Sequence, residues 1–543
     1  MALPTISTEA GEPPPLSSPL SGSVPNNSSD SCNSIWQGYQ CQPQISHYWG
    51  QYSPYFSVPS DIPNEIPHDC EIRFAQLLSR HGARDPTASK TKAYNATIAQ
   101  IKANVKAFDG PYAFLANYSY SLGADQLTTF GQDEMVKSGI KFYTRYEALA
   151  KTVDPFIRSS SENRVVESAL NWTQGFHGAK QADKSVTGDG FPYPLSLQYE
   201  GDGTNNTLNH ALCTDFENGT YSDIGGDAQS VWEKIYIPPI QTRLNADLLG
   251  ANLSADQTIY MMELCPFNTV ADDDGVLSPF CALFTEAEWH SYNYYESLGK
   301  YYGYSFGNPL GPTQGVGFVN ELIARLTNTS VQDHTSTNHT LDDNPATFPL
   351  GRKLYADFSH DNDMTAIFSA LGLYNETTLL PNSTFVEAQA ADGYSAAWTV
   401  PFAARAYIEK MHCESQSEEL VRVIVNDRAL NHALNGNTEM ALSICWELRL
   451  DPRIGVYRRA TVTLLIAQLL SYDQLKYAEE SLELIDLIRQ DNNGEVSYIE
   501  PELSDNLTEI KSMARGLVQE LQEKEKDKQI PESSGTSAES SGS

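Results

Sequence analysis

The sequence lacks any apolar run that approaches the roughly 20 residues needed to cross a bilayer, so it predicts a soluble protein without a membrane partner. It is also poor in basic residues, because 36 Lys and Arg stand against 69 Asp and Glu and leave a formal net charge of -33 at pH 7. Such a chain repels nucleic acid and anionic membranes, and neither is expected to bind it. An anionic substrate would therefore need a local cationic pocket.

No CxxC pair of the kind that holds zinc occurs among the eight cysteines, which favours disulfides over a metal cluster. Residues 1–27 also lack the basic and apolar regions of a signal peptide. Against this, about a dozen Asn-X-Ser/Thr sequons before residue 400 fit a glycosylated extracellular surface. We therefore expect a secreted protein whose signal exon is missing from this sequence, or one that leaves the cell by another route.

The chain divides into four stretches of different composition. Residues 1–30 form a Pro- and Ser-rich leader that is expected to be disordered, and residues 31–428 have the mixed composition of a globular domain. From residue 429 to 522, apolar residues recur at helical spacing, which predicts a helical segment of different character. Residues 523–543 are a charged run ending in Ser and Gly and are expected to be disordered.

Strand and helix patterns alternate within the globular stretch. Residues 72–78, 156–160 and 353–358 are short runs that predict buried strands. Residues 129–149 and 317–326 carry apolar residues at the spacing of amphipathic helices. This alternation predicts an α/β fold.

The strongest chemical signal is the heptad RHGARDP at residues 80–86, which follows the first predicted strand. The guanidinium groups of Arg80 and Arg84 would match phosphate oxygens with forked hydrogen bonds and neutralise the charge that repels a nucleophile. Neutral His81 can then attack phosphorus and form a covalent intermediate. A solvated loop with a surface histidine would explain any one of these residues, but not the whole heptad after a buried run.

A second motif, SHDN at residues 359–362, follows the strand of residues 353–358. Ligands of open α/β sheets bind beyond the carboxyl ends of the strands, so the two motifs are expected to meet in one crevice. Asp361 would give a proton to the departing alkoxide, although an Asp that caps the next helix is an equally good interpretation. Metal-dependent phosphohydrolases also use a His-Asp pair, but the further ligands that they need are not apparent.

Arg158 lies in the strand-like run of residues 156–160, between the two motifs in the sequence. It is either a third arginine for a phosphate cradle or a structural arginine in a salt bridge, and by itself it favours neither interpretation. Together with the two motifs, it indicates hydrolysis of phosphate monoesters.

Four segments, residues 70–90, 299–318, 331–341 and 354–362, resemble the filamentous-fungal phytases, a branch of the histidine acid phosphatases. The similarity runs almost continuously from about residue 32 to residue 428. It implies an α/β domain with a smaller α-helical domain, and a monomer that needs no metal or other cofactor. It also implies hydrolysis of phytate at acid pH through a phosphohistidine.

The resemblance assigns roles to single residues. It makes His81 the nucleophile and Asp361 the general acid. The phosphate ligands that it implies are Arg80, Arg84, Arg158 and His360. The positions that match the lining of the inositol phosphate pocket are Gln51, Tyr52 and Lys300, with Lys90 and Lys92 as weaker candidates at its rim.

The cysteines follow the same resemblance in part. The disulfides that it implies are Cys32–Cys41, Cys70–Cys413 and Cys265–Cys281. Cys213 would pair with a C-terminal family segment that is absent here, so it is left with Cys445 of the helical segment, and no bond between them is expected. We interpret the junction after residue 428 as a mis-joined gene model.

Two departures from the family pattern lie close to the motifs. Asp85 stands where these phytases usually carry Tyr, and Gly299 where some carry a second Lys, so the cationic rim is expected to be thinner. Two alternatives to a phytase therefore stay open. One is a broad-specificity acid phosphatase, and the other is an inactive core fused to a helical interaction module.

Overall fold

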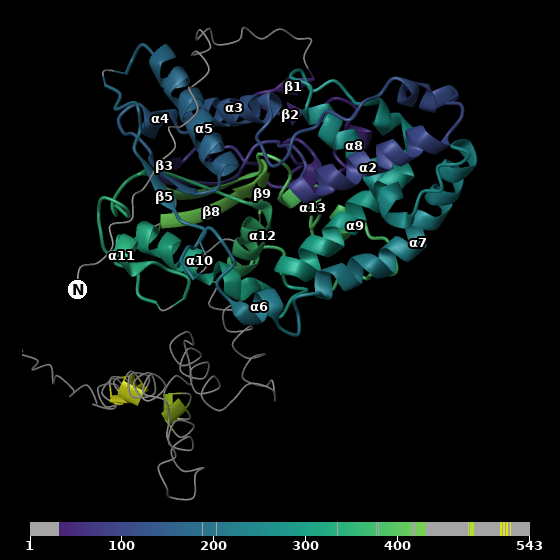
Figure 1. Cartoon of the computed structure of the whole chain (residues 1–543). Coiled ribbons are helices and arrows are strands. Elements are labelled where there is room, and N and C mark those ends of the chain that lie inside the picture. Colours follow the sequence, from purple (N-terminus) through teal and green to yellow (C-terminus); the bar gives the residue numbers. More distant parts are fainter. Residues whose placement is uncertain are drawn as a thin grey trace, which may run out of the picture. The chain divides into compact units, whose positions relative to one another are not determined.

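A sheet of seven strands lies at the centre of the computed structural model, which describes residues 32–430 apart from 187, 202, 334, 376, 378 and 415–418 (Figure 1). Its strand order is β5-β4-β6-β3-β7-β8-β9. The strands from β5 to β3 are parallel neighbours, and β7, β8 and β9 continue the sheet in antiparallel fashion. Their bounds are Leu195–Gln198 (β5), Phe156–Ser160 (β4), Leu354–Ser359 (β6), Cys70–Arg80 (β3), Arg405–Cys413 (β7), Glu419–Val425 (β8) and Arg428–Ala429 (β9).

The chain forms two units, residues 1–433 and 434–543, and the fold described here is that of the first. In the second unit, scattered helical positions between residues 476 and 522 are described. The leader expected at residues 1–30, the rest of the segment expected to be helical from residue 431, and the tail expected at residues 523–543 lie outside the described residues.

Helices cover both faces of the sheet (Figure 1). Leu77 of β3 shares a buried cluster with Trp172 of α5, and Leu78 shares another with Met364 of α12. Adjacent residues of a strand point to opposite faces, so these two leucines anchor the two helical layers. The covering helices are α3 (Thr129–Arg145) and α5 (Asn163–Ala182) on one face, and α10 (Gly311–Thr327) and α12 (Asp361–Ala370) on the other.

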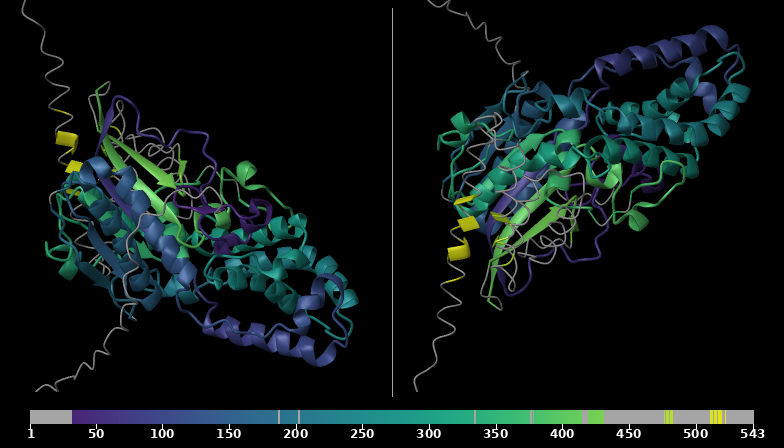
Figure 2. Two further views of the ribbon diagram at one scale, coloured as in Figure 1. Left: turned by 90° about the horizontal axis from the view of Figure 1, so that it is seen from above. Right: turned by 90° about the horizontal axis from the view of Figure 1, so that it is seen from below.

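A smaller group of helices lies at one end of the sheet, as both views of Figure 2 show. Its members are α2 (Ala88–Asn104), α7 (Ile224–Asp247), α8 (Ala255–Val270) and α9 (Glu286–Tyr304). The side chain of Thr285 accepts the backbone N–H of Glu288, whose own side chain accepts the backbone N–H of Thr285, so a capping box starts α9. The expected α/β domain with a smaller α-helical domain is confirmed.

The strands expected at residues 72–78, 156–160 and 353–358 are confirmed as β3, β4 and β6. The helix expected at residues 129–149 is interrupted, because Tyr146 leaves the helical conformation between α3 and α4. The other short elements are β1 (Asn33–Ser34), β2 (Gly38–Tyr39), α1 (Pro43–Ser46), η1 (Gly50–Tyr52), η2 (Gly110–Ala116), α4 (Glu147–Ala150), α6 (Thr214–Asn218), η3 (Pro279–Leu283), α11 (His339–Asp342), η4 (Ala388–Ala391) and α13 (Ala396–Thr399).

Three disulfides link the described residues, and they are the three expected pairs: Cys32–Cys41, Cys70–Cys413 and Cys265–Cys281. Cys70 and Cys413 are direct partners in the antiparallel register of β3 and β7, so their bond links the start of β3 to the end of β7. Within the described part of the chain Cys213 forms no disulfide. None of the described helices has the length and apolarity that a membrane span requires.

Candidate active site

The two sequence motifs meet at the carboxyl ends of neighbouring parallel strands. Arg80, the last residue of β3, is in register with Ser359, the last residue of β6. The residues that follow each strand therefore emerge side by side, and the ring centres of His81 and His360 are 5.7 Å apart. The expected crevice beyond the strand ends is thus formed by both motifs.

Arg80 is held rigidly below this edge. Its side chain is fully buried, and its Nη1 donates to the backbone carbonyls of Gln51 and Val400, the latter at 2.8 Å. Its guanidinium lies 4.6 Å from the ring centre of Phe402, and its Nη2 is 3.3 Å from Oδ2 of Asp361. Two backbone anchors and an aromatic ring therefore fix one cation beside the carboxylate of the second motif.

His81 presents one ring nitrogen to the crevice. Its Nδ1 lies 2.8 Å from the carbonyl oxygen of Gly82, and a carbonyl can only accept, so Nδ1 carries the proton and Nε2 keeps its lone pair. Burial and the neighbouring charges of Arg80, Arg164 and Arg84 hold the pKa of His81 well below its usual value. The lowered pKa favours the neutral imidazole, which is the form that a nucleophile needs.

Asp361 is the first residue of α12, and its carboxylate is directed at two cations. Its Oδ2 accepts from Nζ of Lys300 at 2.7 Å and lies 3.3 Å from Arg80. Burial opposes ionisation, but the charges of Arg80 and Lys300 outweigh it and hold the pKa of Asp361 well below its usual value. The expected general acid is thus stabilised as a carboxylate by these two cations.

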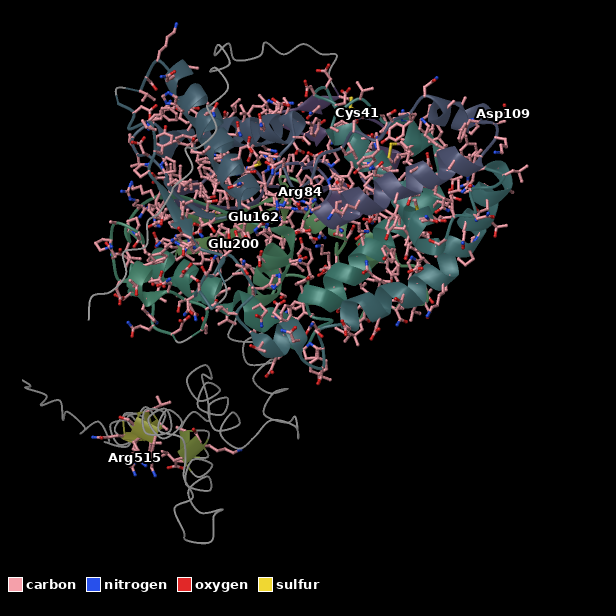
Figure 3. All side chains as sticks on the ribbon, in the orientation of Figure 1. Cys41, Arg84, Asp109, Glu162, Glu200 and Arg515 are labelled. Carbon is pink, nitrogen blue, oxygen red and sulfur yellow. A yellow bond between two sulfur atoms is a disulfide. The ribbon has the colours of Figure 1, made fainter. Side chains whose placement is uncertain are left out.

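His360 lies between two carboxylates. Its Nε2 is 3.3 Å from Oε2 of Glu200 and 3.6 Å from Oε2 of Glu162 (labelled in Figure 3). Burial lowers the pKa of His360, but the hydrogen bond to Glu200 and the charge of Asp363 outweigh it, so the net shift is upward. The same pair lowers the pKa of Glu200 to about 2. His360 is therefore a cation in acid solution.

Glu162, Glu200 and His360 are also the described residues whose side chains could hold a metal ion, since their ligand atoms lie within 4.8 Å of one another. The raised pKa of His360 works against this role, because a protonated imidazole has no lone pair to give to a metal. A charge-paired imidazolium accounts for the same geometry.

A third arginine, which the sequence motifs did not indicate, completes the cationic ring. Arg164 is the second residue of α5, and its charge lowers the pKa of both His81 and His360. It forms an ion pair with Glu162. Arg84 donates to the backbone carbonyl of its neighbour Asp85 at 2.8 Å, and the buried Nε atoms of Arg84 and Arg164 find no hydrogen-bond partner among the described residues.

Arg158 does not reach this site, so its assignment as a phosphate ligand is corrected. Its Nε lies 3.0 Å from Asp357 and its Nη2 lies 2.6 Å from Glu321, in a fully buried ion-pair network. The reason is its register: Arg158 pairs with Asp357 within the sheet, two residues before Ser359 ends β6. The structural interpretation left open for Arg158 is therefore the one that holds.

The expected pocket-lining residues divide into two groups. Lys300 reaches the site through Asp361, and Tyr52 lies beside it, 6.2 Å from Phe402 between ring centres. The side chain of Gln51 instead donates to Oε2 of Glu296 at 2.6 Å. Lys90 is bound to both carboxylate oxygens of Glu263 at 3.0 Å, and Lys92 is exposed on α2.

The negative charge expected beside the site at Asp85 is turned away from the crevice. Its Oδ1 accepts the backbone N–H of Gly123 at 3.0 Å, and burial raises its pKa. The side chain that replaces the usual Tyr is thus used to hold a loop.

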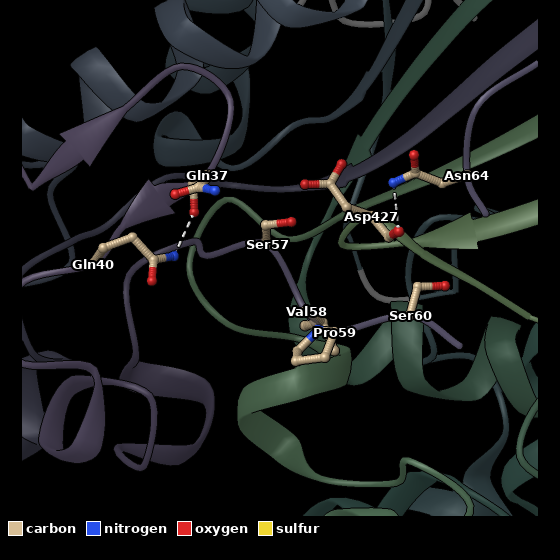
Figure 4. A pocket seen from close by; sticks show the side chains of 8 residues that line it. All are labelled: Gln37, Gln40, Ser57, Val58, Pro59, Ser60, Asn64 and Asp427. Atoms are coloured by element: carbon tan, nitrogen blue, oxygen red, sulfur yellow. Dashed lines mark hydrogen bonds between the residues drawn. The ribbon is translucent and has the colours of Figure 1, made fainter. Parts of the chain in front are cut away.

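A cavity of about 310 Å³ lies apart from these residues (Figure 4). Its lining includes Asp427, whose carboxylate is bound by Lys141 at 2.6 Å and by the hydroxyl of Tyr55 at 2.7 Å. Asn64 donates to the backbone carbonyl of Asp427 at 2.8 Å. Because the acid in its wall is already neutralised by Lys141, the cavity offers no charge of its own to an ionic ligand.

A neutral buried imidazole with a free Nε2, set among guanidinium groups and opposite a carboxyl group, defines a phosphohydrolase that works through histidine. The fold and the comparisons with known proteins agree with this class. The chain belongs to the histidine phosphatase superfamily (branch 2), whose family model matches residues 71–426.

Its relatives include two fungal enzymes named Phytase A. That of Aspergillus oryzae is 53% identical over 420 residues, which cover 76% of this chain and 90% of the relative. That of Emericella nidulans is 53% identical over 426 residues, which cover 76% of this chain and 89% of the relative. Among solved structures, the phytase from D. castellii has the same fold, with a TM-score of 0.58, 24% identity, and coverage of 71% of this chain and 80% of that one.

Proposed function

We propose that the chain is a phytase, a hydrolase of inositol phosphate monoesters that works through a phosphohistidine on His81. The observation that carries this proposal is the free Nε2 of a neutral His81 within a ring of cations and opposite Asp361. The relatives named Phytase A support phytate as the substrate. The three disulfides among the described residues support an extracellular site of action.

The reaction divides between the residues as follows. The Nε2 of His81 attacks phosphorus, and the bond from phosphorus to the ester oxygen breaks while arginines balance the charge of the phosphoryl oxygens. Asp361 gives its proton to the leaving oxygen. Water then attacks phosphorus, the bond from phosphorus to Nε2 of His81 breaks, and the carboxylate of Asp361 takes the proton of the water. The negative charge of bound phosphate offsets Arg80 and Lys300, which raises the pKa of Asp361 and allows it to take up the proton that it later donates.

This division predicts an acid pH optimum. Asp361 must be protonated and His360 must be a cation, and both conditions favour low pH. His81 must be neutral, and its lowered pKa favours that form.

A broad-specificity acid phosphatase is the second candidate. It is favoured by the pairing of polar side chains at the pocket rim with neighbouring carboxylates. Gln51 is tied to Glu296 and Lys90 to Glu263, so two groups expected to meet the outer phosphates of phytate are already engaged. A less cationic rim discriminates less between a small phosphate ester and phytate.

The test compares kcat/KM of the purified chain for phytate and for p-nitrophenyl phosphate across pH, with and without EDTA. A phytase prefers phytate, whereas the second candidate shows similar values. His81→Ala should abolish turnover and the acid-quenched phosphoenzyme. Trapping of labelled phosphate on that variant, or a loss in EDTA that zinc or magnesium restores, would disprove the mechanism.

A further inference from the structure

One carboxylate at the site is bound to its cations and is nevertheless exposed. Glu162 is the N-cap residue of α5, but its side chain makes no capping bond to the first turn. Its carboxylate pairs instead with Nη1 of Arg164 and lies 3.6 Å from Nε2 of His360, while 41% of the side chain remains exposed. A carboxylate in this position occupies one guanidinium donor that suits a phosphate and offsets the charge of a nearby imidazolium.

The other two carboxylates of the site are more tightly enclosed. The side chains of Asp361 and Glu200 are 16% and 17% exposed. Asp361 is bound by Lys300 and Arg80, and Glu200 by His360 and by the backbone N–H of Glu162 at 2.9 Å. Glu162 thus differs from both, because an exposed ion pair is weakly held and its carboxylate can swing into water.

Unsatisfied donors point to a ligand at the same place. The buried Nε of Arg164 has no hydrogen-bond partner among the described residues, although its Nη1 is paired with Glu162. Buried N–H groups without a partner are rare and costly in native proteins. An anion larger than one carboxylate group, with three or four oxygens, would accept from the Nε and the Nη1 of Arg164 together.

We propose that Glu162 is a specificity-determining residue that competes with the phosphate of the substrate for Arg164 and His360. This inference rests on the function proposed above, and it concerns the same site. A phosphate monoester must displace the carboxylate before both cations can bind it. The displaced carboxylate stays at the exposed edge, where it repels any further phosphates of the substrate, so it penalises phytate more than an ester with one phosphate.

The test uses Glu162→Gln, which keeps the size of the side chain, and Glu162→Ser, which removes the charge and supplies a favoured N-cap residue for α5. Glu71→Gln is the matched control for the loss of one negative charge. Glu71 is the second residue of β3, 4.0 Å from Nε of Arg73, with a side chain that is 74% exposed. About ten strand residues separate it from His81, roughly 33 Å at 3.3 Å per residue.

Both Glu162 variants should bind inorganic phosphate about threefold more tightly in calorimetric titrations, since exposed ion pairs contribute free energies of that size. KM for phytate should fall more than KM for p-nitrophenyl phosphate, with kcat unchanged. Glu71→Gln should match the unaltered chain, and all melting temperatures should stay close together.

Unchanged or weaker phosphate binding in both variants would overturn the inference. A joint loss of kcat and affinity would instead mean that Glu162 positions Arg164 productively. Calorimetry separates this test from the proposed function. An unaltered chain that binds phosphate but hydrolyses no ester refutes the function alone, whereas active variants with unchanged affinity refute the role of Glu162 alone.

Discussion

Replacing Lys300 with methionine should extend activity toward higher pH. The Nζ of Lys300 lies 2.7 Å from Oδ2 of Asp361, and their side chains are 10% and 16% exposed. Two unit charges at that distance attract by about 6 kcal/mol at an effective dielectric constant of about 20. Screening by water and the presence of a second cation, Arg80, make the net effect of Lys300 on Asp361 smaller than this energy. An opposite charge beside a carboxyl group typically lowers its pKa by about 1 to 3 units.

The direction of the pH shift follows from the protonated form of Asp361, which the reaction requires. The lysine stabilises the carboxylate and so lowers the pKa of Asp361. Without the lysine this pKa rises, and the proton that the leaving group requires is retained to higher pH. The alkaline limb of the pH profile of kcat should therefore move up by about one unit or more.

The assay is the pH dependence of kcat for two esters with different leaving groups. An alkyl phosphate such as β-glycerophosphate needs protonation of its leaving oxygen, whereas p-nitrophenolate departs without it. The shift should therefore be large for the alkyl ester and small for p-nitrophenyl phosphate. Lys92→Met removes the same charge from an exposed position of α2 and should leave both profiles in place.

A limb that stays in place or moves to lower pH in Lys300→Met would refute the reasoning. An equal shift for both esters would place the titrating group elsewhere, for example on the bound phosphate.

Arg158→Met should lower the free energy of unfolding by about 3 to 5 kcal/mol, because it removes the arginine paired with buried Glu321 and one of the two arginines paired with buried Asp357. Arg164→Met should mainly raise KM, so urea denaturation and steady-state kinetics separate the two variants. Burial and the nearby charge of Glu263 raise the pKa of Glu296 from 4.5 to about 7. The folded state thus keeps a proton that the unfolded state loses, and about 3 kcal/mol of stability should disappear as the pH rises through this range. Unfolding of Glu296→Gln at pH 4.5 and pH 8 should show a smaller loss. Among the described residues six cysteines are in disulfides and Cys213 is not, and we expect titration of the denatured, unreduced chain to find two free thiols, at Cys213 and Cys445; finding none would mean that these two are bonded.

The meeting of the two motifs could be predicted from the sequence because it depends on a general property of parallel sheets. RHGARDP and SHDN each follow a buried strand, and the carboxyl ends of parallel neighbours lie at one edge. The expectation that both motifs lie at this edge did not require the order of the strands. The strand order, with β6 between β4 and β3, had no local signal in the sequence.

The sequence motifs indicated Arg158 as a residue of the site, whereas the structure places Arg164 there. Both arginines lie near the end of β4, and they differ by six positions in a segment that passes from strand to helix. Arg158 lies inside the strand and therefore in the sheet, whereas Arg164 lies in the first turn of the helix that leaves the reactive edge. A preference for arginines after the end of the strand, as at Arg80 and Arg84, would have selected Arg164.

Two of the three carboxylates of the site, Glu162 and Glu200, had no signal in the sequence. Glu162 and Glu200 are single acids in connecting segments, 38 positions apart, and both approach His360 through the tertiary fold. Of the two, Glu200 raises the pKa of His360, together with Asp363, against the lowering effect of burial. A motif can therefore name a residue without fixing its charge.

The charges that gather at the site explain how Asp361 can serve as an acid although its pKa is low without substrate. The cations are Arg80, Arg84, Arg164, Lys300 and His360, and the carboxylates are Asp361, Glu162 and Glu200. Asp363, whose charge also acts on His360, adds a fourth carboxylate, so the five positive groups outnumber the negative groups by one. Substrate binding therefore cancels the local field that keeps Asp361 ionised, and its pKa rises when the ester that needs its proton arrives. The surplus also accounts for anion binding by a chain whose net charge is -33, because the attraction acts at contact distance while the repulsion of the distant surface is screened by salt.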